Sequence, residues 1–195
     1  MVAANPAVGR FNSITRTAAQ TRVLDAAYRL FADKGVSATS LQMIADAMGV
    51  TKAAIYYQFK TKDEIVIALT ERQLAGLEDV LDAAEAEPSR PRARELLLER
   101  VIDIAVADRR LVSVLQFDPV VVRLLAEHPP FQQFITRLYR AMLGDEADTA
   151  ARVHAAMMSG AISVAVMHPL VADISDEELK AQLLASMRRM VELRE

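Results

Sequence analysis

Cysteine is absent from this chain of 195 residues. Disulfide bonds and thiolate metal sites are therefore excluded, which agrees with a reducing compartment. The chain has only three histidines, His128, His154 and His168, and their positions lack the spacing of a metal site. It also lacks a glycine-rich phosphate loop and any paired motif of nucleophile and base. We therefore predict that the protein is not an enzyme and needs neither a cofactor nor a metal ion.

Long apolar runs are missing as well. The N-terminal stretch MVAANPAVGRFNSITR lacks the apolar core of a signal peptide. The most hydrophobic run, VHAAMMSGAISVAVM, is too short to cross a membrane and is followed by Pro169. We interpret this run as a helix buried on several sides, and we expect a cytoplasmic protein with no membrane partner.

Acidic residues are scarce in the first third of the chain and abundant afterwards. The net charge of −3 hides a formal charge of +5 over residues 1–62 and of −8 over residues 63–195. A basic segment joined to an acidic body indicates a polyanion-binding module fused to a different domain.

Helical periodicity dominates the pattern of apolar residues, and the strict alternation typical of strands is rare. Gly35 is expected to end a first long helix, and Gly49 permits a tight turn after a second, shorter one. We predict an all-α fold of about nine helices without a sheet. Three pairs have the spacing of a capping box at a helix start: Thr39 with Gln42, Thr61 with Glu64, and Ser175 with Glu178.

The segment GVTKAAIYYQFKTKDEI, residues 49–65, interleaves tyrosines with lysines. Ile55 and Phe59 share one face of a short helix and are expected to point inward, so that Lys52 and Tyr56 share the outward face. Two short helices joined by a turn match the helix-turn-helix pattern, whose second helix enters the major groove of DNA. Hydroxyl and ammonium groups bind phosphate, so the segment has the pattern of a phosphate clamp around a base-reading helix.

The run from Arg22 to Ile65 resembles the N-terminal domain of the TetR family of bacterial transcriptional repressors. The residues that carry the resemblance are AAYRLFADKGVSATSLQMIADAMGV followed by TKAAIYYQFKTKDEI. The resemblance implies a three-helix unit that binds DNA within a homodimer, followed by helices for ligand binding and dimerisation. We expect a flexible basic arm over residues 1–16, a helix-turn-helix DNA-binding domain over residues 17–64, and a ligand-binding and dimerisation domain over residues 65–195.

The resemblance also assigns DNA contacts position by position. The start of the recognition helix would face bases or backbone, and the tyrosines and the lysine beyond them would contact mainly phosphate. Arg10 and Arg16 in the arm either follow a DNA groove or belong to a tail that merely happens to be basic. The candidate DNA-binding residues are Ser40, Gln42, Thr51, Lys52, Ala53, Tyr56, Tyr57 and Lys62.

The remaining two thirds of the chain resemble the family only in architecture, so the ligand site is predicted from composition. Methionines and phenylalanines occur near helices broken by proline, where packing without gaps is difficult, and this favours a largely apolar pocket. Ordinary core packing is the alternative for each residue. The candidates are Phe117, Val121, Leu125, Phe134, Leu138, His154, Met157 and Met158.

The last two expected helices carry many small and apolar residues, which permit close packing. We expect them to form the interface of a homodimer, as is usual in the family; packing within one chain is the alternative. The expected function is that of a TetR-like repressor that binds double-stranded operator DNA in the bacterial nucleoid and is released by a small, hydrophobic effector. A DNA-binding regulator or structural protein without a small-molecule ligand is the alternative.

Overall fold

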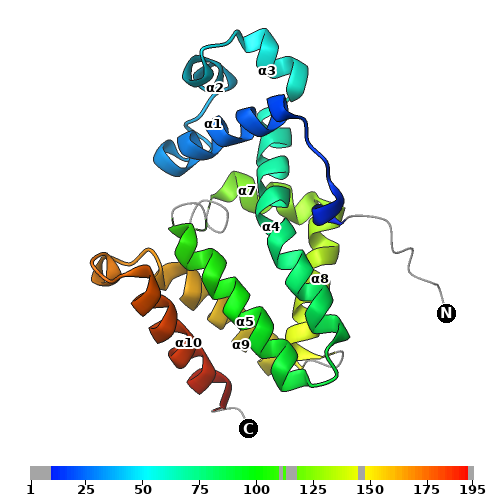
Figure 1. The fold of residues 1–195 in the computed structure, drawn as a ribbon, viewed down its shortest axis with the longest axis vertical. Helices are drawn as coiled ribbons and strands as arrows, with labels where there is room; N and C mark the ends of the chain where they lie inside the picture. The colour runs from blue at the N-terminus through cyan, green and yellow to red at the C-terminus, as the bar shows by residue number, and fades with distance from the viewer. Residues whose placement is uncertain (1–9, 110–111, 113–117, 145–147, 193–195) are drawn as a thin grey trace, which may run out of the picture. The chain divides into compact units, whose positions relative to one another are not determined.

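The computed structural model contains nine α-helices and two short 3-10 helices in the part of the chain that it describes, with no strand there (Figure 1). The prediction of an all-α fold with about nine helices is confirmed. None of the described helices is both long enough and apolar enough to cross a membrane. The described residues are 10–109, 112, 118–144 and 148–192.

The contacts divide the chain into two compact units. The first unit contains the described residues of Met1–Glu78 and Val114–Phe134, and the second contains those of Asp79–Ser113 and Ile135–Glu195. Two helices, α4 and α8, therefore begin in the first unit and continue along the chain into the second.

The first unit is built on α1 (Ala18–Lys34), α2 (Leu41–Met48), α3 (Lys52–Gln58) and the beginning of α4 (Lys62–Ala86). Helices α1, α2 and α3 contact one another (Figure 1). Each turns an apolar face inward, because residues three and four apart share a face of a helix. The side chains buried on these three faces are Val23, Leu24, Ala27, Phe31, Ile44, Ala45 and Ile55.

The start of α2 differs from the expected capping box of Thr39 and Gln42. Ser40 is the N-cap, and its hydroxyl oxygen accepts a hydrogen bond from the Met43 N–H at 3.2 Å. Thr39 is buried instead, and its hydroxyl donates to the Gly35 carbonyl oxygen at 2.8 Å. Thr39 thus stabilises the α1–α2 connection, and the exposed Ser40 beside it caps α2.

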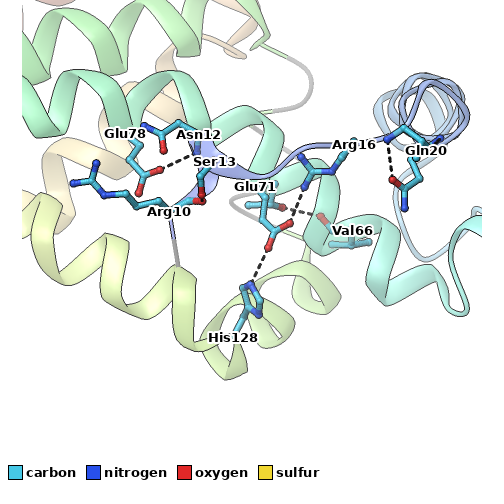
Figure 2. A network of polar contacts seen from close by, with 11 residues as sticks. Arg10, Asn12, Ser13, Arg16, Gln20, Val66, Glu71, Glu78 and His128 are labelled. Carbon is cyan, nitrogen blue, oxygen red and sulfur yellow. Dashed lines mark hydrogen bonds and ion pairs between the residues drawn. The ribbon is translucent and has the colours of Figure 1, made fainter. Parts of the chain in front are cut away.

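Residues 10–16, which we call the N-terminal strap, differ from the expected flexible arm. Phe11 is only 2% exposed, and its ring centre lies 5.5 Å from that of Phe134. The Asn12 N–H donates to the buried carboxylate of Glu78 at 3.0 Å (Figure 2). The aromatic pair and the hydrogen bond to a buried carboxylate hold the strap in place. Their stabilisation exceeds the conformational entropy that so short a segment loses when it is ordered.

The first unit is completed by α7 (Pro119–Glu127) and the beginning of α8 (Pro129–Leu143). Asp118 caps α7, accepting from the Val120 N–H at 2.9 Å, and a proline opens the helix because its fixed φ suits a first turn. Val121 and Leu125 form the buried face of α7.

The second unit contains α5 (Arg90–Ala107), α9 (Thr149–Ala165) and α10 (Asp176–Glu192), with a 3-10 helix at Pro169–Val171. Helix α5 contacts both α9 and α10. Together they form one apolar cluster of buried residues: Leu98, Ile102, Ala105, Val106, Met158, Ile162, Val166, Leu179, Leu183, Leu184 and Met187.

Polar contacts hold the end of α8 in the second unit. Arg137 pairs with Asp82 at 2.6 Å and with Glu85 at 2.7 Å, both on α4. The hydrogen bonds with Glu85 and then Asp82 raise the pKa of Arg137 above its ordinary value. The Arg94 side chain donates to the Met142 carbonyl oxygen at 2.7 Å, near the last turn of α8.

Candidate nucleic-acid interface

The connection between α2 and α3 fixes the direction of α3. Gly49 ends α2 with a φ of 65°, a left-handed conformation that favours glycine. The Val50 N–H then donates to the Ala45 carbonyl oxygen at 3.0 Å. Thr51 caps α3 by accepting from the Ala54 N–H at 3.2 Å. This helix–turn–helix arrangement agrees with the prediction.

The inner side of α3 is anchored by two apolar side chains. Ile55 is 1% exposed, and Phe59, the C-cap residue, is 6% exposed. With these residues in the core, the helix cannot rotate about its axis without exposing one of them to water. The orientation of the opposite face is therefore set by the packing of the first unit.

The opposite face of α3 presents the residues that the sequence predicts. Tyr57 is 81% exposed and Tyr56 is 41% exposed, which is unusual for large aromatic side chains. Lys52 and Ala53 are exposed on the first turn. The Lys52 ammonium nitrogen lies 5.5 Å from the centre of the Tyr56 ring, so charge and hydroxyl groups form one surface. We call Lys52, Ala53, Tyr56 and Tyr57 the α3 face.

Residues at the two helix starts lie next to this face in the chain and are also exposed. Ser40 and Thr51 use their hydroxyl oxygens as caps. The Gln42 side-chain amide donates to the Asp46 carboxylate at 2.8 Å, one turn further along α2. The Gln42 side chain is thus oriented by a neighbour, and the capping hydroxyls retain the ability to donate to an incoming acceptor.

Lys62 differs from its expected role as a phosphate contact. Its ammonium group is partly buried and donates to the carbonyl oxygens of Val36 at 2.7 Å and of Thr39 at 2.9 Å. Both carbonyls lie just before the N-cap of α2. Lys62 therefore ties the start of α4 to the start of α2, and two of its three N–H donors are used within the protein.

Arg16, which the sequence places in a basic arm, is also engaged. Its guanidinium pairs with the Glu71 carboxylate at 2.7 Å, and His128 Nε2 lies 3.3 Å from the other carboxylate oxygen (Figure 2). Glu71 therefore joins the strap to the turn between α7 and α8. Arg16 is part of the internal structure of the first unit rather than a free DNA contact.

The eight candidate ligand residues do not come together in one unit. Phe117 lies outside the described residues. The next three candidates are buried in the first unit, and three others belong to the second. Met157 is 60% exposed on α9 and lines no described pocket. The members buried in the first unit are Val121, Leu125 and Phe134, and those inside the second are Leu138, His154 and Met158.

His154 is the one ligand candidate with an unusual polar environment. Its Nε2 atom is buried and has no hydrogen-bond partner among the described residues. A buried polar atom without a partner is unfavourable by about 1–3 kcal/mol. His154 therefore places an atom capable of hydrogen bonding on the inner side of α9.

Composition alone did not identify a hollow that the second unit forms between α8 and α9. It has a volume of about 760 Å³, within the range of small-molecule sites. Helix α8 contributes Ile135, Thr136, Tyr139, Arg140 and Leu143, and Gly144 follows it. Helix α9 contributes Thr149, Arg152, Val153 and Ala156. The signal available in the sequence was their helical spacing, which places each set on one face. We call this hollow the α8–α9 groove.

The exposed side of α9 carries large apolar side chains next to Arg152. Val153, Met157 and Val164 are each at least half exposed, and they recur at helical spacing. The opposite side of α9 is buried in the second unit. The apolar band of α10 is also buried there, against α5, so the dimer surface expected from the last two helices falls mainly on α9.

Comparison with known proteins gives a consistent picture of the first unit. Residues 23–69 match the family model described as "Bacterial regulatory proteins, tetR family". The chain is 40% identical over 93 residues to the HTH-type transcriptional regulator AcrR of Shigella flexneri, covering 45% of this chain and 42% of that protein. It is 39% identical over 68 residues to the HTH-type transcriptional regulator TtgR of Pseudomonas putida, covering 35% of this chain and 32% of that protein. The alignments thus span less than half the length of these relatives.

The fold comparison extends over most of the chain. The crystal structure of NalD, a secondary repressor of the MexAB-OprM multidrug efflux pump in Pseudomonas aeruginosa, matches with a TM-score of 0.65. The match covers 88% of this chain and 94% of that structure at 24% sequence identity. At this identity the likeness concerns the fold alone.

Proposed function

Because the chain belongs to the TetR family of bacterial transcriptional regulators, we propose that it represses transcription by binding double-stranded operator DNA as a homodimer. Proteins of this family are regulators rather than enzymes. Its target is bacterial chromosomal DNA, so we place its action in the cytoplasm at the nucleoid.

The α3 face is the observation that carries this proposal. Exposed tyrosine hydroxyls and a lysine ammonium group supply the phosphate contacts that position a protein on a duplex. Ala53 leaves room for α3 to approach base edges and contacts a thymine methyl group. Ser40, Gln42 and Thr51 contact the sugar–phosphate backbone or a groove edge from the helix starts. Lys62 acts differently, because it holds the start of α2 next to the start of α4.

The exposed apolar side of α9 supports the homodimer. A surface of valine and methionine side chains at half exposure or more favours burial against a second copy. Two copies related by a two-fold axis present two α3 faces, and operator half-sites lie roughly 34–36 Å apart, one turn of DNA. The outer side of α10 lies in the same interface.

Release of the repressor requires a ligand that binds one conformation better than another. We propose that a small effector with an apolar body enters the second unit and favours a dimer whose α3 faces no longer match the half-sites. Helix α8 is the element that transmits the change: Phe134 packs on Phe11 in the first unit, and the next residue, Ile135, lines the α8–α9 groove. Equal affinity for both conformations would leave the DNA affinity unchanged.

The test is selection of bound fragments from bacterial genomic DNA with the full-length protein, followed by mobility shifts on the enriched sequence. We expect enrichment of an inverted repeat with half-sites one helical turn apart. Recovery of fragments without a shared sequence, or failure to bind duplex DNA at low ionic strength, would contradict the proposal. A regulator without an effector would bind the repeat but gain no thermal stability from any member of a lipophilic library.

A further inference from the structure

The α8–α9 groove has a chemical character that its volume alone does not convey. Its walls are apolar, with Ile135 and Leu143 on α8 and Val153 and Ala156 on α9. The guanidinium groups of Arg140 and Arg152 line the same hollow, one from each helix. Each wall therefore combines an apolar strip with a permanent positive charge.

The charge of this groove is opposite to that of the region that contains it. Residues 63–195 carry a formal charge of −8, yet the described residues that line the groove include no aspartate or glutamate. Other arginines of the second unit face carboxylates: Arg137 pairs with Asp82 and Glu85, and Arg188 pairs with Glu95. Among the described residues, no carboxylate pairs with Arg152. The Arg152 guanidinium thus gives the groove a positive charge that no described carboxylate neutralises, within an acidic region.

Hydroxyl groups complete the polar side of the groove. Tyr139 lies on α8 beside Arg140, and Thr149 lies one turn before Arg152 on α9. A guanidinium binds a carboxylate through parallel N–H donors, and hydroxyl groups donate to the same kind of oxygen. The apolar strips are suited to a hydrocarbon body of comparable length.

We propose that the α8–α9 groove binds a small amphipathic anion, with an oxyanion head between Arg140 and Arg152 and an apolar body along both helices. This deepens the proposed function, because such a molecule would be the effector of the repressor. The concave shape and a volume of about 760 Å³ fit a single small molecule better than the flat surface of an anionic bilayer.

The experiment measures binding of decanoate to the full-length protein by isothermal titration calorimetry, below the concentration at which decanoate forms micelles. Decanol is the neutral probe with the same body, acetate is the anion without the body, and decane sulfonate is a second anionic head. We expect decanoate and decane sulfonate to bind, and decanol and acetate to bind at least about tenfold more weakly, since each lacks one half of the interaction.

The matched variants are Arg152→Gln in the groove and Arg123→Gln on the exposed surface of α7. We expect Arg152→Gln to weaken decanoate binding about tenfold or more and to leave decanol binding unchanged. Arg123→Gln should bind both probes like the wild type. No measurable binding of decanoate, equal binding of decanol, or an unchanged affinity in Arg152→Gln would each overturn the proposal. Binding to anionic vesicles in place of free decanoate would also overturn it.

A parallel measurement separates this proposal from the proposed function. The same samples are titrated with the selected operator duplex. A wild-type protein that binds decanoate but no duplex would retain the groove and reject the repressor. A protein that binds the duplex but no decanoate would retain the repressor and reject this ligand class. A decrease in operator affinity on adding decanoate, absent in Arg152→Gln, identifies the anion as an effector.

Discussion

In the first unit, the α3 face that is proposed to contact DNA lies on a helix of seven residues, whose inner side is fixed by Ile55 and Phe59. In the second unit, the proposed ligand groove lies between α8 and α9, which are longer helices of 15 and 17 residues. The α3 face follows from a local pattern, because side chains of a short helix that are not buried in the core must face the solvent. The groove depends on which faces of α8 and α9 pack inward, and that is decided by partners distant in the chain.

The largest expected effect tests whether the first unit depends on a distant partner as well. Phe134→Ala removes a fully buried ring and its contact with Phe11, and we expect a loss of about 3–5 kcal/mol in the free energy of unfolding. The measurement is urea unfolding of the full-length chain followed by circular dichroism. Phe131→Ala, at a half-buried position of the same helix, is the matched control and should cost less. Equal losses in the two variants would show that the strap contributes nothing.

The next effect concerns the exposed side of α9. Met157→Glu places a charge in the proposed dimer interface, and we expect the dissociation constant of the dimer to rise by at least about a hundredfold, ~2.7 kcal/mol. Sedimentation velocity over a range of protein concentrations provides the measurement. Val122→Glu changes an apolar side chain of similar exposure on α7 and should leave the dimer intact. A dimer that persists in Met157→Glu would favour packing within one chain as the only role of α9.

A smaller effect sharpens the role of Lys62. Lys62→Met removes one donor from each of two carbonyl oxygens, those of Val36 and Thr39, and we expect a loss of about 1–3 kcal/mol in stability together with weaker operator binding. Because the ammonium group is engaged inside the protein, the slope of log affinity against log salt should stay the same. Lys34→Met, at an exposed site, is the control. A slope that is smaller by about one in Lys62→Met would instead show that Lys62 contacts a phosphate, as the sequence predicts.

The smallest effect concerns the exposed tyrosine hydroxyl on the α3 face. Tyr57→Phe removes one hydroxyl group and retains the ring, so we expect about 1 kcal/mol, roughly a fivefold loss of DNA affinity. Fluorescence anisotropy with the operator and with a scrambled duplex measures it. An equal loss on both duplexes identifies a phosphate contact, and a loss on the operator alone identifies a base contact. Wild-type affinity for both would remove Tyr57 from the interface.

Local patterns predicted the helices and several of their ends. Ser175 accepts from the Glu178 N–H at 3.2 Å, and Thr61 accepts from the Glu64 N–H at 3.1 Å, as the spacing indicates. The pattern failed at Thr39, because two adjacent hydroxyl residues were both suited to the cap and only burial distinguished them. Which of the two residues caps the helix depends on tertiary packing, and a window of four residues carries no information about that packing.

Distant partners explain the remaining differences between expectation and structure. Phe11 stands in a polar stretch, and nothing near it in the sequence indicates that it packs against Phe134. Lys62 was assigned to phosphate by the resemblance to the family, whereas its acceptors belong to the connection before α2. Ligand candidates chosen for their residue type fell in different units, since methionine and phenylalanine serve cores as well as pockets.

The central claim is that the α3 face binds duplex DNA, and its most direct test is a salt titration of operator binding by the wild type, Lys52→Gln and the control Lys34→Gln. The account predicts tight binding at low ionic strength, a linear decrease of log affinity with log salt, and a slope smaller by about one in Lys52→Gln alone. A wild-type protein that ignores the duplex at low salt, or a slope in Lys52→Gln equal to that of the control, would contradict it.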